Sequence, residues 1–303
     1  MAKNHKNTRL NTVSTGTEAI IHIMIGLFSL CCIIPFIFVI IIAFSSEQSI
    51  REIGYSFWPT QWSTATFAYA FGKLPQIWRS FFNSVFITVV GTLASTTMCA
   101  LYSYALYRPD FKFRNFFTFF SFFTMIFGGG LVPTYVISTK VLGLGENYAA
   151  LIIPLLVSPF NIIIMRTFFQ SSVPMDLIEA ATIDGSGEYS TLFRVVIPIA
   201  KPGLATVALL NALAYWNDWW NAIMLVDDKK LYPLQYLLLQ LKSQIQMIKD
   251  MQKMMGGSIP GQKAPSESLK MATSIITIGP IVLLYPFLQK YFVKGLVVGA
   301  VKG

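Results

Sequence analysis

Charged residues are scarce in this sequence. Only 12% of its 303 residues are Asp, Glu, Lys or Arg, and 54% are hydrophobic, whereas soluble globular proteins carry about 25% charged residues. This shortage excludes an ordinary soluble domain and indicates a chain embedded in a lipid bilayer. The net charge is +9, but the basic residues lie scattered between apolar runs, whereas a nucleic-acid-binding protein collects them on one solvated face.

Residues suited to metal binding and acid–base catalysis are equally few. The sequence has the histidines His5 and His22 and the cysteines Cys31, Cys32 and Cys99, and their spacing makes no metal site. Because all three cysteines fall inside apolar stretches, we expect them to pack in the protein core. No nucleophile–base arrangement is visible. The sequence therefore predicts no metal, no cofactor held by this chain, no catalytic residue and no enzymatic activity.

Long apolar runs, in contrast, are abundant. About 20 mostly apolar residues in a helix cross the hydrocarbon layer, and runs of this kind occur at residues 19–44, 81–107, 116–138, 148–165, 203–226 and 271–288. The first run is longer than the core of a signal peptide and no cleavage site follows it, so we expect it to be retained. The sequence predicts an all-α polytopic membrane protein: six transmembrane helices within residues 19–294, and tails at 1–18 and 295–303.

The positive charges next to short loops indicate the orientation of these helices. Arg108, Lys112 and Arg114 crowd the loop after the second run, and both tails are also basic. This pattern places that loop and both termini in the cytoplasm. The segment 227–270, which would then lie outside, carries seven lysines, so the orientation depends on the short loops.

The third run contains helix-breaking residues at its middle. Gly128, Gly129 and Gly130 are followed by Pro133, and irregular backbone at that depth is tolerated only against protein or a water-lined cavity. The break is therefore a candidate part of a translocation path, with Tyr135 beside it. A helix–helix contact through the glycines explains the pattern equally well. The prolines of the other runs are expected only to kink their helices.

Residues 170–202, between the fourth and fifth runs, have the pattern of a short capped helix. Ser172 is suited to cap it, Pro174 to its first turn and Gly185 to its stop, while two alanines leave a small surface. A second short helix is expected at about 188–195, ending at Pro198. Such a helix-turn-helix either receives a larger body that approaches closely or rests on the membrane surface.

The same segment resembles a known motif. Glu179-Ala180-Ala181, Asp184-Gly185 and Ile197-Pro198 resemble the EAA loop of binding-protein-dependent ABC importer permeases, with Val195 and Ile197 where that family usually has Ile and Leu. The aspartate before the glycine, Asp184, resembles the form of this motif in the carbohydrate branch of the family, as in maltose-type permeases. The resemblance extends to residues 127–135, 166–169, 216–217 and 289–303. Together these segments most resemble permeases for pectin-derived or other oligosaccharides.

The resemblance implies a type I ABC importer permease in the bacterial cytoplasmic membrane. Its coupling loop at 170–202 would dock in a cleft of the ATPase through Glu179, Ala180, Ala181, Asp184, Gly185 and Pro198. The expected partners are a second permease subunit, two ATPase subunits that bind the ATP, an extracellular solute-binding protein and a sugar. The external loop 227–270, with Gly256, Gly257 and Gly261, would reach into the binding protein, or else serve as a solvated linker; the C-terminal tail would contact the ATPases.

The fifth run carries the clearest polar residues within the membrane. At 100° per residue, an arc of about 120° holds four candidate path residues, Asn211, Asn217, Asp218 and Asn221. These side chains face the bundle, where they could bind either sugar hydroxyls or neighbouring helices. Trp216, Trp219 and Trp220 fall on the other side and are expected at the membrane interface rather than stacked on sugar.

The sequence also bears on the energy source. It has no Walker A motif, so ATP would be hydrolysed by a separate subunit. The alternative is an ion-coupled secondary sugar carrier, which needs buried ionisable residues as relays. Asp218 alone qualifies among the six runs, and this favours ATP coupling.

Overall fold

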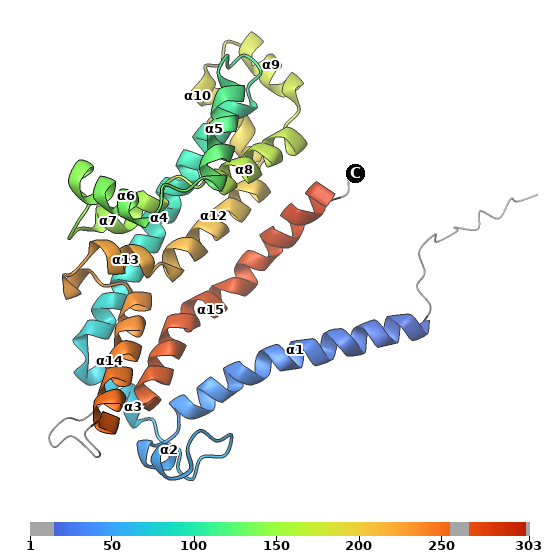
Figure 1. Ribbon diagram of the computed structural model, residues 1–303. Helices are drawn as coiled ribbons and strands as arrows, with labels where there is room; N and C mark the ends of the chain where they lie inside the picture. Colours follow the sequence, from blue (N-terminus) through green and yellow to red (C-terminus); the bar gives the residue numbers. More distant parts are fainter. Residues whose placement is uncertain (1–14, 255–266, 301–303) are drawn as a thin grey trace, which may run out of the picture. The chain divides into compact units, whose positions relative to one another are not determined.

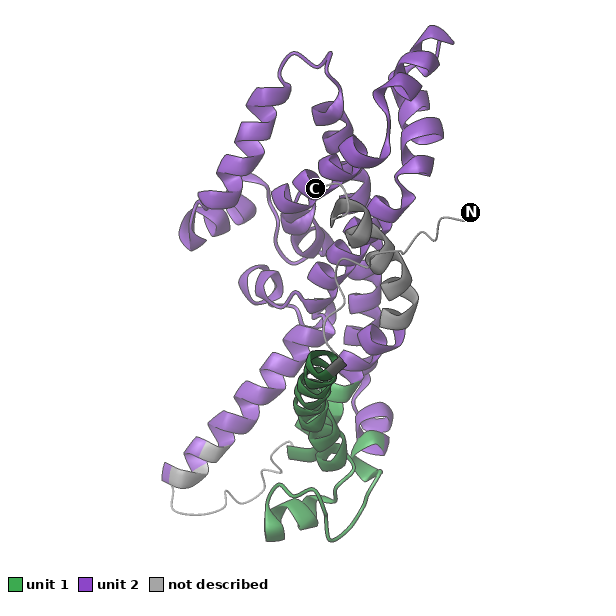
Figure 2. Ribbon diagram, turned by 90° about the vertical axis from the view of Figure 1, so that its right-hand side faces the viewer, with its two compact units in different colours: residues 1–67, 266–275 green, residues 68–265, 276–303 purple. Residues whose placement is uncertain are grey.

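The computed structural model describes residues 15–254 and 267–300, and apart from one isolated bridge between Ser45 and Trp62 its regular structure there is helical (Figure 1). The chain divides into two compact units, residues 1–67 with 266–275 and residues 68–265 with 276–303 (Figure 2). The C-terminal helix α15 (Glu267–Ala300) has residues in both units.

The first unit contains α1 (Thr15–Ala43), α2 (Glu47–Ile53) and the beginnings of α3 (Ala65–Lys73) and α15. Most side chains of α1 are exposed, as suits a helix dissolved in lipid. Cys31 and Cys32 are among them, so the expected core packing is wrong for these two cysteines; Cys99, in the second unit, is buried. Tyr55 donates a hydrogen bond to Glu267, and burial together with this carboxylate raises the pKa of Tyr55, so its hydroxyl stays protonated.

The second unit is built around α4 (Pro75–Tyr107), which packs against α8 (Pro159–Ser172) and α12 (Lys201–Asn217). The buried residues of α4 include a run of small side chains, Gly91, Ser95, Cys99 and Ser103. Small side chains allow helix backbones to approach closely. The Ser103 hydroxyl accordingly donates to the backbone oxygen of Ile162 on α8 at 2.9 Å.

Shorter elements complete this unit. They are α5 (Arg114–Ile126), α6 (Leu131–Val136), the π-helical turn η1 (Ile137–Val141), α7 (Tyr148–Ile152), the 3₁₀ turn η2 (Ile153–Leu155), α9 (Met175–Ile183), α10 (Glu188–Thr191), the π-helical turn η3 (Leu192–Val196), α11 (Ile197–Ile199), α13 (Trp220–Leu225), the 3₁₀ turn η4 (Lys229–Leu231) and α14 (Leu234–Met254).

Two described helices are long and apolar enough to cross a membrane unbroken, residues 16–43 of α1 and the whole of α4. Three bent pairs raise this number to five if each pair is one span: α5 with α6 and η1, α7 and η2 with α8, and residues 188–199 with α12. The sixth expected span, 271–288, lies in α15 and passes beyond Leu283, the last residue whose side chain is described.

The expectation of simple kinks is wrong for the fourth run. The helix stops after Leu155 and restarts at Pro159 with a 51° bend. Pro159 follows the Ser158 N-cap, whose hydroxyl accepts a bond from the Asn161 N–H. Because proline suits the first turn of a helix, Pro159 begins a new helix instead of bending one.

Candidate functional site

The helix α9 carries the residues of the EAA resemblance. Ser172 is the last residue of α8, and Pro174 is the N-cap of α9, where no side chain caps the helix; the expected Ser172 cap is wrong because α8 continues through it. The stop at Gly185 is confirmed. Its φ of +78° accompanies bonds from Gly185 N–H to Thr182 O at 3.0 Å and from Ser186 N–H to Ala181 O at 2.9 Å, which together form a Schellman motif.

One face of α9 is anchored and the other is open. Ile178 is completely buried in a core cluster with residues of α4, α8 and α12. Glu179, Ala180, Asp184 and Gly185 are exposed and Ala181 is half-buried. The anchored face fixes the position of the helix, so the small exposed face can receive another body without rearrangement of α9.

The second predicted helix is present but irregular. It runs from Glu188 through α10, η3 and α11 to Ile199 and meets α12 at a bend of 88°. Pro198 lies exposed within α11, and the chain turns at Ala200 rather than at Pro198. The π-helical turn brings Leu192 and Val196, both buried, onto the core face.

The broken third run and the end of the fifth run line one cavity of about 320 Å³. Helix α5 ends at Ile126, Gly130 has a φ of +83°, and the chain leaves in α6 with a 115° bend. Of the predicted path residues, Tyr135 and Asn221 line this cavity. Its other lining residues are Gly128, Gly129, Gly130, Leu131, Thr134, Ser138, Trp220, Met224 and Leu225. Backbone, hydroxyl and amide groups beside an aromatic ring suit a neutral polar ligand.

The expected continuous polar stripe on the fifth span is wrong, because the helix breaks at Asp218. Asp218 has extended backbone with ψ of 114°. Its Oδ1 accepts the N–H groups of Trp220 at 3.1 Å and Asn221 at 3.3 Å, and its Oδ2 accepts the Asn221 side chain at 2.9 Å. Aspartate competes with the helical backbone in this way, so Asp218 caps α13 and orients Asn221.

The other two candidates on this span do not line the cavity. Asn211 is buried; its Oδ1 accepts from Asn161 at 2.6 Å and its Nδ2 donates to Thr96 at 3.1 Å, which ties α12 to α8 and α4. Asn217 donates to Leu213 O and accepts from Gln235. These contacts match the helix-binding alternative.

The tryptophans of this span also differ from one another. Trp216 is buried and its ring N–H donates to Thr277 O at 3.0 Å, so the expected interfacial position is wrong for Trp216. Trp219 and Trp220 are each partly exposed.

Sequence reasoning missed Glu146, which fixes the far end of α13. Its Oε1 and Oε2 accept the N–H groups of Asp227 at 2.7 Å and Asp228 at 2.8 Å, and its own N–H donates to Leu225 O. Glu146 is the one non-glycine residue with positive φ, +52°, in residues 15–254 and 267–300, a conformation that costs about 1 kcal/mol. A lone acid in a loop gives no sequence signal for this role.

The predicted contact residues for a binding protein cannot be placed. Gly256, Gly257 and Gly261 lie outside the described residues. The part of that loop before these glycines forms the helix α14.

Together, interrupted apolar helices around a polar cavity and an exposed helix-turn-helix define a class: a polytopic membrane protein built to move a solute. The family model described as "Binding-protein-dependent transport system inner membrane component" matches residues 97–298. The chain belongs to this family. It is therefore an inner membrane component of a transport system that works with a solute-binding protein and an ATPase, and its place is the cytoplasmic membrane.

Relatives along nearly the whole chain agree with this assignment. The polygalacturonan/rhamnogalacturonan transport system permease protein YtcP of Bacillus subtilis is 37% identical, over 94% of this chain and 98% of its own length. The arabinooligosaccharides transport system permease protein AraQ of Halalkalibacterium halodurans is 29% identical, over 89% and 91%. A crystal structure of a bacterial ABC transporter involved in the import of the acidic polysaccharide alginate has a chain that superposes with a TM-score of 0.78 at 30% identity, over 93% of this chain and 99% of that chain.

Proposed function

We propose that this chain is the permease subunit of an ATP-driven importer for an oligosaccharide, of the class released from pectin. The relatives named for polygalacturonan, rhamnogalacturonan and arabinooligosaccharides support a plant cell-wall substrate. The cavity between α6 and α13 offers hydroxyl, amide and aromatic groups, the groups that bind sugars. None of its described lining residues is a cation, so recognition of a uronate carboxylate falls to the binding protein or to a second permease.

The observation that carries the proposal is the exposed face of α9. Glu179 and Ala180 of α9, and Gly185 just after it, are exposed, while Ile178 on the other side of the helix is completely buried. A firmly seated helix with a small outer surface is suited to enter a cleft of an ATPase subunit and to pass its motion into the membrane helices. ATP is bound and hydrolysed by that partner, and the permease has no catalytic residue of its own.

The proposed assembly contains this chain, a second permease subunit, two ATPase subunits and a solute-binding protein. On α5, Phe116, Phe119 and Phe120 are exposed, and this apolar face is available to the second permease or to lipid. Both termini and the loop of α9 and α10 lie in the cytoplasm, as Arg108, Lys112 and Arg114 favour by their charge. The predicted external segment 227–270 would then lie on the side of the binding protein.

An ion-coupled carrier is the rival function, and its candidate relay is Asp218. That carboxylate already accepts three hydrogen bonds as the cap of α13, which favours a structural role. Uptake by energised cells that is abolished by a protonophore but unaffected by loss of the ATPase gene would establish the rival instead.

A pair of substitutions at Gly185 tests the coupling role. A Cβ at this position meets nothing within 4 Å in the chain itself, so Gly185→Glu adds bulk and charge only toward a docked partner. Glutamate at φ of +78° also strains the backbone, and Gly185→Asn is the control because asparagine tolerates this conformation. We expect Gly185→Glu to abolish oligosaccharide uptake at normal membrane abundance and Gly185→Asn to retain most of it. Normal uptake by Gly185→Glu would refute docking at α9.

The substrate class needs a separate experiment. The purified complex, with ATPases and binding protein, is reconstituted in proteoliposomes, and ATP hydrolysis is measured with galacturonan, rhamnogalacturonan, arabinan and maltodextrin oligosaccharides. We expect stimulation by the pectin-derived sugars. Stimulation by maltodextrin alone would contradict the pectin assignment and leave the importer mechanism intact.

A further inference from the structure

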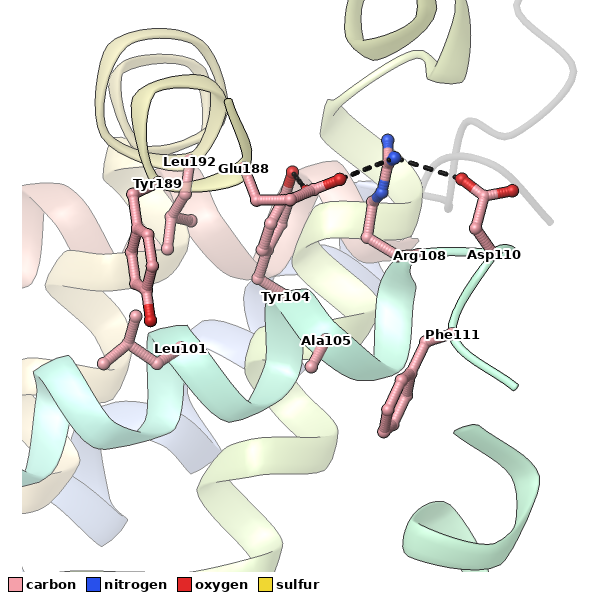
Figure 3. A pocket seen from close by; sticks show the side chains of 9 residues that line it. All are labelled: Leu101, Tyr104, Ala105, Arg108, Asp110, Phe111, Glu188, Tyr189 and Leu192. Carbon is pink, nitrogen blue, oxygen red and sulfur yellow. Dashed lines mark hydrogen bonds and ion pairs between the residues drawn. The ribbon is translucent and has the colours of Figure 1, made fainter. Parts of the chain in front are cut away.

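A polar cluster joins the end of α4 to the start of α10 (Figure 3). Tyr104 Oη donates to Glu188 Oε2 at 2.8 Å, and Arg108 Nη2 donates to Glu188 Oε1 at 2.9 Å. The same Nη2 donates to Asp110 Oδ2 at 3.0 Å. Both oxygens of Glu188 are thus held by residues of one helix end, 84 and 80 positions away in the chain.

The two ion pairs of Arg108 differ in which parts of the structure they connect. The Arg108 side chain is only 12% exposed, whereas Glu188 is 61% and Asp110 79% exposed. A cation withdrawn from water is attracted more strongly to its carboxylate than one on an open surface. Asp110 lies two residues from Arg108 and makes a local contact. Glu188 lies on another element, so of these two ion pairs it is the Arg108–Glu188 pair that joins α10 to α4.

Packing beside this cluster is incomplete. A cavity of about 490 Å³ lies beside it, and its lining includes Leu101 and Ala105 of α4 together with Tyr189 and Leu192 (Figure 3). Tyr189 is 75% exposed, so the first turn of α10 is held to α4 through hydrogen bonds more than through packed side chains. The hydrogen bonds of Glu188 to Tyr104 and Arg108 are therefore the polar attachment of this turn to α4.

We propose that Glu188 is a positioning residue that transmits movement of the α9–α10 loop to α4. This proposal rests on the proposed function, in which the loop receives force from the ATPase. Through Arg108 and Tyr104, a displacement of α10 is applied at the end of the helix that packs against both α8 and α12. The cluster therefore adds a polar joint to the apolar contacts of Ile178 and Leu192.

Matched substitutions separate this role from a general structural one. Glu188→Gln removes the charge of the joint, while Asp110→Asn removes an equal charge from the same guanidinium without touching α10. A spin label at Val89→Cys, on an exposed position of α4, reports movement of that helix in a background with Cys31, Cys32 and Cys99 replaced by serine. The spectrum is recorded for the assembled complex without nucleotide and with ATP plus vanadate, so no sugar is required.

We expect the nucleotide-dependent spectral change in the parent complex and in Asp110→Asn. In Glu188→Gln the change should fall about five-fold or more, the lower range of measured site–site couplings, with the ATPases still co-purifying. Combining Arg108→Gln with Glu188→Gln should cause no further loss, since partners of one interaction are not additive. Tyr104→Phe, which removes only a hydroxyl, should cause a partial loss.

Other results have distinct meanings. An equal response in Glu188→Gln and Asp110→Asn, or additive losses in the Arg108–Glu188 cycle, overturns the inference. Were Glu188→Gln to prevent assembly, Tyr104→Phe decides: a full response there overturns the joint, and a reduced response supports it. If no ATPase co-purifies with the parent complex, or ATP plus vanadate changes nothing in it, the proposed function itself fails.

Discussion

The contact between α4 and α12 allows a prediction of defined size. A Cβ added at Gly91 of α4 would stand 2.6 Å from two atoms of the Tyr215 ring, well inside van der Waals contact. The ring cannot simply turn away, because Tyr215 is only 2% exposed and its hydroxyl donates to Ile152 O at 2.9 Å. Gly91→Ala must therefore shift the two helices or break that bond.

The cost follows from these two contributions. Overpacking a tight core costs about 1–3 kcal/mol, and the lost hydrogen bond about 1 kcal/mol. We expect Gly91→Ala to lower the thermal midpoint of the detergent-purified protein by on the order of 5 °C. Gly279→Ala, in α15, is the control, since a Cβ there meets nothing within 4 Å.

A second substitution tests the cause. Replacing Tyr215 by leucine removes the atoms that overlap, so Gly91→Ala should cost much less in a Tyr215→Leu background than in the parent. Thermal midpoints of the four proteins give this comparison. If the cost of Gly91→Ala is the same in both backgrounds, the clash with Tyr215 is not its source and the reasoning fails.

Two further predictions concern polar contacts in the same unit. Asn211→Leu should lower the free energy of unfolding by about 1–2 kcal/mol, because Asn161 and Thr96 both lose a hydrogen bond. In a denaturation series, the double variant Asn161→Leu/Asn211→Leu should lose less stability than the sum of the two single losses. Strict additivity would refute a shared network. Glu146→Gln should speed hydrogen exchange of the Asp227 and Asp228 amides several-fold by weakening their charged acceptor, and unchanged exchange in that peptide would show that the carboxylate does not hold the end of α13.

The sequence predicts features of this fold that depend on neighbouring residues. Gly185 ends α9 because glycine readily adopts the left-handed conformation of the Schellman motif. Gly128 to Gly130 break the third run because three consecutive glycines disfavour a helix. The break at Asp218 also has a local cause, because its side chain accepts the N–H groups of Trp220 and Asn221. The sequence did not predict this break, since Asp218 also fits the polar stripe of a continuous helix.

Contacts between distant segments could not be predicted. Nothing in the residues around Asn211 indicates that its partners are Asn161 and Thr96, 50 and 115 positions away. From the sequence, Arg108 indicated only that its loop is cytoplasmic. Its charge suits such a loop with or without a nearby carboxylate, so the ion pair with Glu188 could not be predicted. Such pairs exist because α4, α8 and α12 pack together, and a single sequence does not state which faces of three apolar helices meet.

Helix α4 links the candidate cavity to the candidate coupling loop. Its Ile87 packs in one apolar cluster with Ala222 and Leu225 of α13, beside the cavity. Its other end, from Cys99 to Tyr107, packs in a second cluster with Ile178 of α9. A continuous helix of 33 residues spans about 50 Å and resists bending, because no proline interrupts it after Pro75. Under the proposed function, a displacement of α9 would therefore reach α13 through this one continuous helix, and α13, capped by Asp218 and held by Glu146, would move as a short separate piece.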